Sequence, residues 1–370
     1  MRRWLLAMVV VLTTAGLGAS ALPLCDYRSP VTNLADMAIS FAYEYHNDPY
    51  GLESSDVNEG QFEVSYVRLY DQPEFGFDVE VYNDMLISVL DVSTYTTFVN
   101  ASYKRYFATE RNFFAFAGAL GRSSSSFESL ALSINFGVGC GRFVDVTPLA
   151  TATRIDEYLV KRGSLTDHLH PVDLQILADE IGSVATYESL AALLDAVQDV
   201  IEGSGNVKMG GLDALDISEI TRLIQAEGFS RYCGWDLKIG LGYELLDPSG
   251  GANDLLITGA LNYAFATTPS EQFLIQGSFS GQPDLLETNR IDVTVAYDWL
   301  LTDFLGLAAT YDFSRETWVA EPTDIHRIAL DFTLTPLDTA EVVFSVVFER
   351  RPYYLEWNVD LQLKIGIDLL

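Results

Sequence analysis

Apolar and polar residues alternate along most of this chain. Between Trp235 and Tyr243 the odd positions are Trp, Leu, Ile, Leu and Tyr, whereas the even positions are Asp, Lys, Gly and Gly. A period of two is the signature of β-strands, because successive side chains point to opposite faces of a sheet. Counting such segments predicts about fourteen strands, about six before residue 147 and about eight after residue 231. Their expected bounds are 36–46, 61–71, 75–83, 94–107, 112–121, 128–142, 232–245, 254–266, 271–280, 289–300, 303–314, 325–335, 340–350 and 355–369.

The segment from Thr147 to Arg231 has a different period, close to 3.6 residues, which is typical of amphipathic helices. Thr147-Pro148 is a helix start and Gly163 a stop, and three further helices are expected after Pro171, after Thr186 and at Asp216–Glu219, which has capping-box spacing. The sequence therefore predicts a small four-helix unit inserted between the sixth and seventh strands.

The N-terminus has the pattern of a secretory signal peptide. Arg2 and Arg3 precede an apolar run from Trp4 to Leu12, and Ala19-Ser20-Ala21 supplies the small residues that signal peptidase requires. Removal of residues 1–21 leaves no apolar stretch long enough for a membrane-spanning helix, which needs about 20 residues. Any membrane insertion must then use strands. The expected organisation is a signal peptide (1–21), a first β part (22–147), a helical insert (148–231) and a second β part (232–370).

Alternation alone does not tell whether the apolar face points inward, as in a soluble sandwich, or outward to lipid. Two features favour the outward orientation. Aromatic residues lie near strand ends on the apolar face, as in the interfacial girdles of membrane barrels; they include Tyr45, Trp235, Tyr243, Trp299, Phe313 and Trp357. The connections also alternate between long ones, such as His46–Gly60, and tight ones, such as Asp71–Glu74.

On these strands and turns, the chain resembles bacterial outer-membrane β-barrel proteins of the porin-like class. The resemblance implies an all-β transmembrane antiparallel β-barrel of about 14 strands in the bacterial outer membrane, in contact with its lipid. Short turns and both termini then face the periplasm. Because the sixth strand runs toward that side, the α-helical subdomain at 148–231 is expected to be periplasmic as well.

Charged residues concentrate on the polar face of the strands. The whole chain has 52 Asp and Glu against 22 Lys and Arg, a formal net charge of −30, which argues against nucleic acid as a partner. The residues expected to line the lumen are Asp78, Glu80, Asp236, Lys238, Glu244, Asp292, Asp298, Asp312, Arg327, Asp331, Glu356, Asp360, Lys364 and Asp368. Because acids predominate, we expect a passive, cation-preferring diffusion channel for small hydrophilic solutes.

Two other functions stay open at this point. The barrel could anchor the helical unit at 148–231 as a docking platform for a periplasmic protein. Alternatively, His46 and His326, which lie near the predicted outer rim, could serve an outer-membrane hydrolase. No catalytic motif, cofactor site or metal site is predicted, since His168 and His170 lack the spacing that places two ligands on one helical face.

The three cysteines leave a choice about disulfides. Cys140 ends the sixth predicted strand and Cys233 begins the seventh, so the two sulfurs are expected either to form a disulfide or to remain as buried thiols. Cys25 is then left over.

Overall fold

The structure is a computed structural model, and it describes residues 23–28, 32–46, 57–88, 91–108, 112–225, 230–247, 254–284, 288–302, 304–318, 321–337, 340–350 and 357–367. The predicted signal peptide, Glu356 and Asp368 lie outside these residues, and so do the side chains of Tyr45 and Lys364. All later statements concern the described part of the chain.

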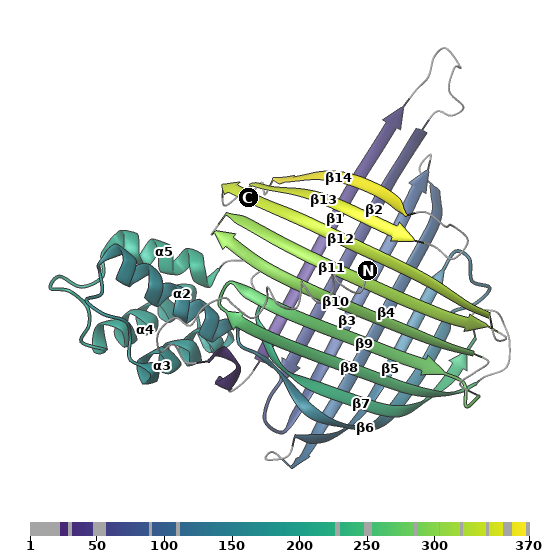
Figure 1. Cartoon of the computed structure of the whole chain (residues 1–370), viewed down its shortest axis with the longest axis horizontal. Helices are drawn as coiled ribbons and strands as arrows, with labels where there is room; N and C mark the ends of the chain where they lie inside the picture. Colours follow the sequence, from purple (N-terminus) through teal and green to yellow (C-terminus); the bar gives the residue numbers. More distant parts are fainter. Residues whose placement is uncertain are drawn as a thin grey trace, which may run out of the picture.

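Fourteen strands form a single antiparallel sheet in which every strand pairs with its neighbours in sequence, from β1 to β14. Figure 1 shows that the sheet curls, so that β1 to β5 cross behind the later strands. This confirms the predicted antiparallel β architecture of about fourteen strands with a helical insert. The strands are β1 (Thr32–His46), β2 (Val57–Asp71), β3 (Phe75–Ser88), β4 (Asp91–Ala108), β5 (Phe113–Ser124), β6 (Ala131–Asp145), β7 (Tyr232–Leu246), β8 (Leu255–Thr268), β9 (Glu271–Gly281), β10 (Thr288–Thr302), β11 (Leu305–Trp318), β12 (Glu321–Leu337), β13 (Ala340–Arg350) and β14 (Asn358–Ile367).

The connections at the two ends of the sheet differ less in length than the sequence predicts. The end that carries the helical insert has tight turns, such as Pro269–Ser270 between β8 and β9. We call it the short-turn end and the opposite end the long-loop end. The expected strand bounds left long connections at Asn83–Ser93 and Ser314–Asp324. This prediction is wrong, because β3 continues to Ser88 opposite Asp91 of β4, and β11 continues to Trp318 opposite Glu321 of β12. Backbone pairing continues there although the alternation of side chains has ended.

The polarity of the sheet is inverted relative to a soluble protein. On β7, Ile239 is 58% exposed, whereas Asp236 is only 3% exposed. The same strand also exposes Trp235, Leu237, Leu241 and Tyr243 and buries Gly240 and Gly242. Exposed apolar side chains recur in the same phase on other strands, for example at Phe41, Phe136, Leu361 and Leu363. An apolar surface this extensive needs a nonaqueous environment, so the apolar phase is the outer face of the sheet and the polar phase its inner face.

The insert between β6 and β7 is a compact helical unit. Its helices are α2 (Thr147–Arg162), α3 (Pro171–Gly182), α4 (Leu190–Gly203) and α5 (Ala214–Ile224), with a short 3-10 turn η2 (Val184–Thr186) before α4. The first helix ends as predicted, with Gly163 in the left-handed conformation. Its start is one residue earlier than predicted, since Val146 and not Thr147 is the N-cap and Pro148 is the second helical residue. The predicted capping box at Asp216–Glu219 is wrong. Asp213 is the N-cap of α5 and exchanges hydrogen bonds with Asp216, so the helix starts earlier.

The helical unit has a hydrophobic core of its own. Leu149, Ile155, Leu177, Leu193 and Ile220 are all essentially inaccessible to solvent and belong to one cluster of buried side chains. Within the described residues, none of the helices has the length and apolarity needed to cross a bilayer.

The side chains of β6 and β7 change the face to which they point where these strands leave the sheet for the helical unit. Gly141 on β6 has a φ of +99°, and a Cβ there would lie 2.2 Å from the carbonyl oxygen of Trp235. Gly234 on β7 has a φ of +94° and faces the same region of the ladder. Only glycine adopts this backbone without strain. Beyond these two glycines, Val144 and Cys233 belong to the core of the helical unit.

This irregularity explains why a Cys140–Cys233 disulfide, one of the two alternatives that the sequence left open, does not form. In the ladder, Cys140 lies opposite Leu237 and Cys233 lies opposite Val144. The two cysteines are therefore offset by four residues, about 13 Å along the strands. Cys233 instead forms a disulfide with Cys25, and Cys140 is a free thiol.

An ion pair in the helical unit gives its stability a pH dependence. The Nδ1 atom of His168 lies 2.6 Å from a carboxylate oxygen of Asp156, which also accepts a hydrogen bond from the Leu169 amide. The hydrogen bond to Asp156 raises the pKa of His168 above its usual value of 6.5.

We predict that the helical unit loses stability as the pH rises. A histidine whose pKa is higher in the folded state stabilises fully below pH 6.5, and this contribution disappears as the pH rises through the folded pKa. Thermal unfolding followed by helical circular dichroism should give a lower melting temperature at pH 8.5 than at pH 6. His168→Gln should remove most of this difference, and the matched His170→Gln should not. A melting temperature that rises with pH in the wild type would contradict the prediction.

Candidate functional site

The inner face of the sheet collects most of the charged residues that the sequence singles out. Side-chain contacts between neighbouring strands place several of them together. Thr294 donates a hydrogen bond to Asp312 (2.8 Å), and Arg327 lies 3.8 Å from the same carboxylate. These contacts join β10, β11 and β12 on one face. Glu244, Asp298 and Asp331 lie half-buried in the same phase of their strands, while Glu80 and Asp360 are exposed. That these residues line a water-filled path stays a prediction.

Two ion pairs connect strands that are not neighbours. Lys238 on β7 lies 3.9 Å from Asp78 on β3, and Arg142 on β6 lies 3.6 Å from Asp71 on β2. In each case the strands are four positions apart in the sheet, which is about 19 Å along a flat sheet. Contact at under 4 Å requires strong curvature, so these side chains reach across the interior. The interior is therefore narrow between β2–β3 and β6–β7.

The contacts around Asp71 form a compact cluster near the short-turn end. The buried carboxylate of Asp71 lies 3.3 Å from the Nζ atom of Lys104 and accepts a hydrogen bond from the Tyr106 hydroxyl at 3.3 Å. The Arg142 guanidinium lies 4.1 Å from the centre of the Tyr106 ring and donates hydrogen bonds to the carbonyl oxygens of Gln72 and Pro73. We call Asp71, Lys104, Tyr106 and Arg142 the Asp71 cluster. Its charges are mutually paired, which is required for buried ions.

Aromatic rings pack beside the Asp71 cluster on the inner face. Phe114 and Phe116 on β5 are buried, and Phe114 makes an edge-to-face contact with Tyr106. Glycines on the next strands make room for the rings. A Cβ at Gly139 would lie 2.4 Å from the Phe114 ring, and one at Gly240 would lie 2.9 Å from the Phe116 ring. The interior at this level is thus occupied by aromatic as well as charged side chains.

Toward the long-loop end, the inner face is more open and its acids are partly neutralised. Arg290 lies 2.8 Å from Asp292, which also accepts a hydrogen bond from the Ser314 hydroxyl. Both members of the ion pair are about 40% exposed. The end of the interior away from the Asp71 cluster therefore presents solvated charges.

The outer face carries the aromatic residues that are expected to form a girdle, and their contact with a lipid interface stays a prediction. Trp235, Tyr243, Trp299 and Trp357 are exposed in the apolar phase, and Phe313 is half-buried. His326 lies in this belt and not beside a nucleophile: its Nδ1 atom is 2.9 Å from the Tyr311 hydroxyl, and its ring contacts Phe313 and Trp357. The side chain of His46, the other histidine of the hydrolase hypothesis, lies outside the described residues.

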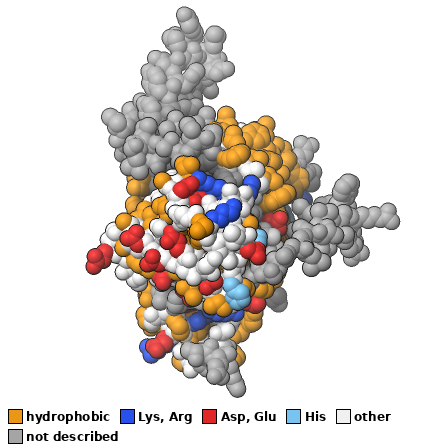
Figure 2. Space-filling model, turned by 90° about the vertical axis from the view of Figure 1, so that its left-hand side faces the viewer, with side chains coloured by type: hydrophobic (Ala, Val, Ile, Leu, Met, Phe, Trp, Pro, Cys, Tyr) orange, Lys and Arg blue, Asp and Glu red, His pale blue; other side chains and the backbone are white. Residues whose placement is uncertain are grey.

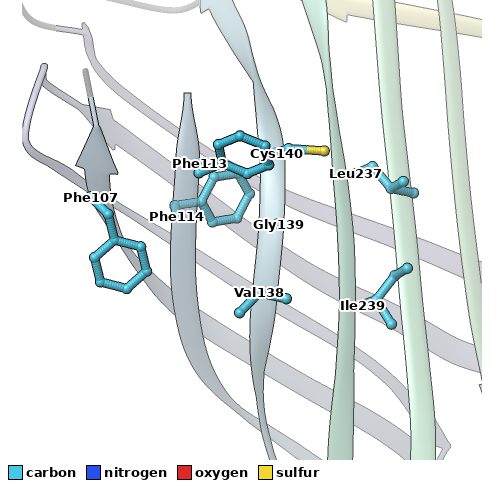
Figure 3. A pocket seen from close by; sticks show the side chains of 8 residues that line it. All are labelled: Phe107, Phe113, Phe114, Val138, Gly139, Cys140, Leu237 and Ile239. Atoms are coloured by element: carbon cyan, nitrogen blue, oxygen red, sulfur yellow. The ribbon is translucent and has the colours of Figure 1, made fainter. Parts of the chain in front are cut away.

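An apolar hollow of about 300 Å³ opens on the outer face near the short-turn end. Figure 3 shows how its lining side chains project from β4, β5, β6 and β7, with Cys140 at its upper edge. The lining residues are Phe107, Phe113, Phe114, Val138, Gly139, Cys140, Leu237 and Ile239. The free thiol of Cys140 therefore lies in apolar surroundings.

The described residues contain no group of three or more His, Cys, Asp or Glu side chains arranged to hold a metal ion. His168 and His170 are not brought together, since His168 bonds to Asp156 and His170 caps α3.

Sequence reasoning missed most of the Asp71 cluster. Asp71 and Arg142 lie at strand ends, where alternation no longer assigns a face, and Gly141 shifts Arg142 from the apolar to the polar phase. A usable signal was the row of glycines on β6 and β7, which leaves space opposite Phe114 and Phe116 on the inner face.

Comparisons with known proteins show no family for this chain. No protein-family model matches it, and no curated protein is significantly similar to it in sequence. Among solved structures, it is similar to the CymD monoaromatic hydrocarbon channel at 10% sequence identity with a TM-score of 0.27, and to the TodX monoaromatic hydrocarbon channel deltaS2 mutant at 9% identity with a TM-score of 0.29. Each match covers 88% of this chain and 85% of the other.

Proposed function

We propose that this protein is a bacterial outer-membrane channel through which small hydrophilic solutes diffuse passively, with a preference for cations. The observation that carries the proposal is the inverted polarity of the sheet, with large apolar side chains exposed on one face and charged side chains on the other. A sheet of this kind is stable where hydrocarbon covers the outer face and water reaches the inner one.

The cation preference rests on the charges of the inner face. Several basic residues there are paired with acids, as in Lys238–Asp78 and Arg290–Asp292. Acids remain in excess in the inner phase. Fixed charges act over about 10 Å at 0.1 M salt, so a narrow, acid-lined interior concentrates cations and repels anions.

The Asp71 cluster supports a constriction near the short-turn end of this path. Its four side chains come from β2, β4 and β6 and meet in the interior. We place the short-turn end and the helical unit on the periplasmic side, in line with the short periplasmic turns of outer-membrane barrels. Solutes entering from the long-loop end would then pass the open, solvated half before the constriction.

The test is the reversal potential of the purified protein in planar bilayers under a KCl gradient. We expect a potential of cation-selective sign that weakens as the salt concentration rises. The triple variant Glu80→Gln, Asp331→Asn and Asp360→Asn should shift this potential toward zero, because it removes three negative charges from the inner phase. Asp324→Asn is the matched control. Asp324 pairs with Arg315, which follows the inner residue Ser314 and so belongs to the outer phase.

Anion selectivity in the wild type would contradict the cation preference. A folded protein that conducts nothing at any voltage would contradict the channel itself.

One observation favours a second function, in which the sheet anchors a docking platform. The helical unit exposes apolar side chains on α3, where Val172 is 58% exposed and Ile176 lies one turn further on the same face. Figure 2 views this unit end-on and shows apolar, acidic and basic side chains interspersed on its surface. The second proposal is therefore that residues 148–231 bind a periplasmic protein partner. Absence of conduction would favour this function over the channel.

A further inference from the structure

The segment Pro23–Arg28, which we call the N-terminal strap, lies between the end of the sheet and the helical unit. It contains a short 3-10 turn, η1 (Leu24–Asp26), visible as the dark purple helix below α2 in Figure 1. Leu24 and Tyr27 are buried in the core cluster of the helical unit, with Tyr27 only 4% exposed. The strap is far in sequence from every element that it contacts.

Two bonds attach the strap to different bodies. On the sheet side, Cys25 forms a disulfide with Cys233 in the first residues of β7, across a sequence separation of 208. The Cys233 side chain packs at the edge of the helical core, but its backbone belongs to the sheet. On the helical side, the Tyr27 hydroxyl donates a hydrogen bond of 3.0 Å to Asp179 on α3. The strap therefore spans the junction between the two.

Without the strap, the helical unit is connected to the sheet through a narrow neck. The two chain crossings lie side by side, since the Val146 amide donates to the Arg231 carbonyl at 2.8 Å and the Arg231 amide donates to the Thr147 hydroxyl at 2.8 Å. Two adjacent crossings can act as a hinge. Further contacts with the sheet come from the Arg231 guanidinium, which donates hydrogen bonds to the carbonyl oxygens of Pro269 and Ser270, and from Ala266 on β8 and Leu300 on β10, which pack against the helical core.

We propose that the N-terminal strap is a redox-controlled latch that fixes the orientation of the helical unit at the short-turn end of the sheet. The latch closes by thiol–disulfide exchange with an oxidised dithiol protein. One thiolate of the Cys25 and Cys233 pair attacks the oxidant's disulfide, and the other displaces the oxidant from the mixed disulfide. The chain gives up two electrons and two protons, and the oxidant leaves as a dithiol. In the reduced chain, only noncovalent contacts hold the strap.

The latch does not depend on conduction, so its test does not measure conductance. The full-length protein in detergent is compared by amide hydrogen exchange as oxidised wild type, reduced wild type, Cys25→Ser and the control Cys140→Ser. In reduced wild type and in Cys25→Ser, exchange should accelerate about tenfold or more at the Tyr27 amide and in α3 around Asp179. The central residues of β10 and β11, and every position in Cys140→Ser, should exchange as in oxidised wild type.

Unchanged protection at Tyr27 and in α3 after reduction would overturn the latch. Tyr27→Phe, which keeps the disulfide but removes the hydrogen bond to Asp179, distinguishes the two attachments. If the disulfide is the latch, this variant should exchange far more slowly at these positions than Cys25→Ser. Exchange as fast as in Cys25→Ser would show instead that the hydrogen bond holds the strap. Loss of protection on reduction in a protein that does not conduct would leave the latch standing and remove only the channel.

Discussion

The combined variant Asp71→Asn, Lys104→Met and Arg142→Met is expected to conduct at least roughly twice as well as the wild type. The three changes remove the charges of the Asp71 cluster together, so that none of these three ions is left buried without its partner, and the buried Asp236, which interacts with Lys104, keeps its hydrogen bond from Asn262. Methionine cannot reproduce the contact of the Arg142 guanidinium with the Tyr106 ring or its hydrogen bonds to the turn carbonyls. The bridge between β2 and β6 is then lost and the interior widens. Single-channel recording in planar bilayers measures the effect.

The matched control changes an ion pair of the inner face near the long-loop end. Arg290→Met with Asp292→Asn removes one charge of each sign, and the ion pair joins two residues of a single strand, although both charges also interact with Arg122 on β5. Its conductance should stay close to that of the wild type. Equal increases in both variants would show that the Asp71 cluster is not the constriction.

The second large effect is a loss of stability of the helical unit. Leu193 on α4 is fully buried in its core, and Leu193→Ala should lower the free energy of unfolding of the unit by about 3 kcal/mol, as is usual when a buried leucine leaves a cavity. Leu215→Ala on α5 is the control, since that side chain is 67% exposed and should contribute little. Chemical denaturation followed by helical circular dichroism gives both values.

The unfolding transition of the strands in the same variant shows whether the sheet and the helical unit unfold independently. Because the helical unit has its own core, its transition should move while that of the strands stays in place. If both transitions moved by the same amount, the two parts would unfold as one cooperative body.

The strands could be predicted because apolar and polar side chains alternate strictly along the central band of the sheet. On β7 every second residue from Trp235 to Tyr243 is large and apolar. Beyond that band the constraint disappears. The prediction ended β3 near residue 83, although it continues to Ser88, because backbone hydrogen bonds need no apolar side chains. Alternation alone fits a sandwich as well, so the outward direction of the apolar face was predicted from the aromatic residues near strand ends and from the connection lengths.

The interior contacts could not be predicted for a different reason. Pairs such as Arg142–Asp71 and Lys238–Asp78 join strands separated by three others, and their approach depends on the curvature of the whole sheet. The cysteine pairing failed similarly. Which cysteines meet was decided by Gly141 and Gly234, where the backbone leaves the regular ladder. Local periodicity contains no information on either point.

The position of Cys140 has a consequence for the order of assembly. The chain reaches Cys140 before Cys233, so Cys25 encounters the wrong thiol first during synthesis and export. The correct disulfide closes a loop with a separation of 208 residues, and it must wait until β7 has formed. Cys140 lies in the apolar hollow of the outer face, apart from the helical core that surrounds Cys233. Pairing of β6 with β7 sets Cys140 opposite Leu237 and Cys233 opposite Val144, so the register of the ladder itself separates the competing thiol from the correct one.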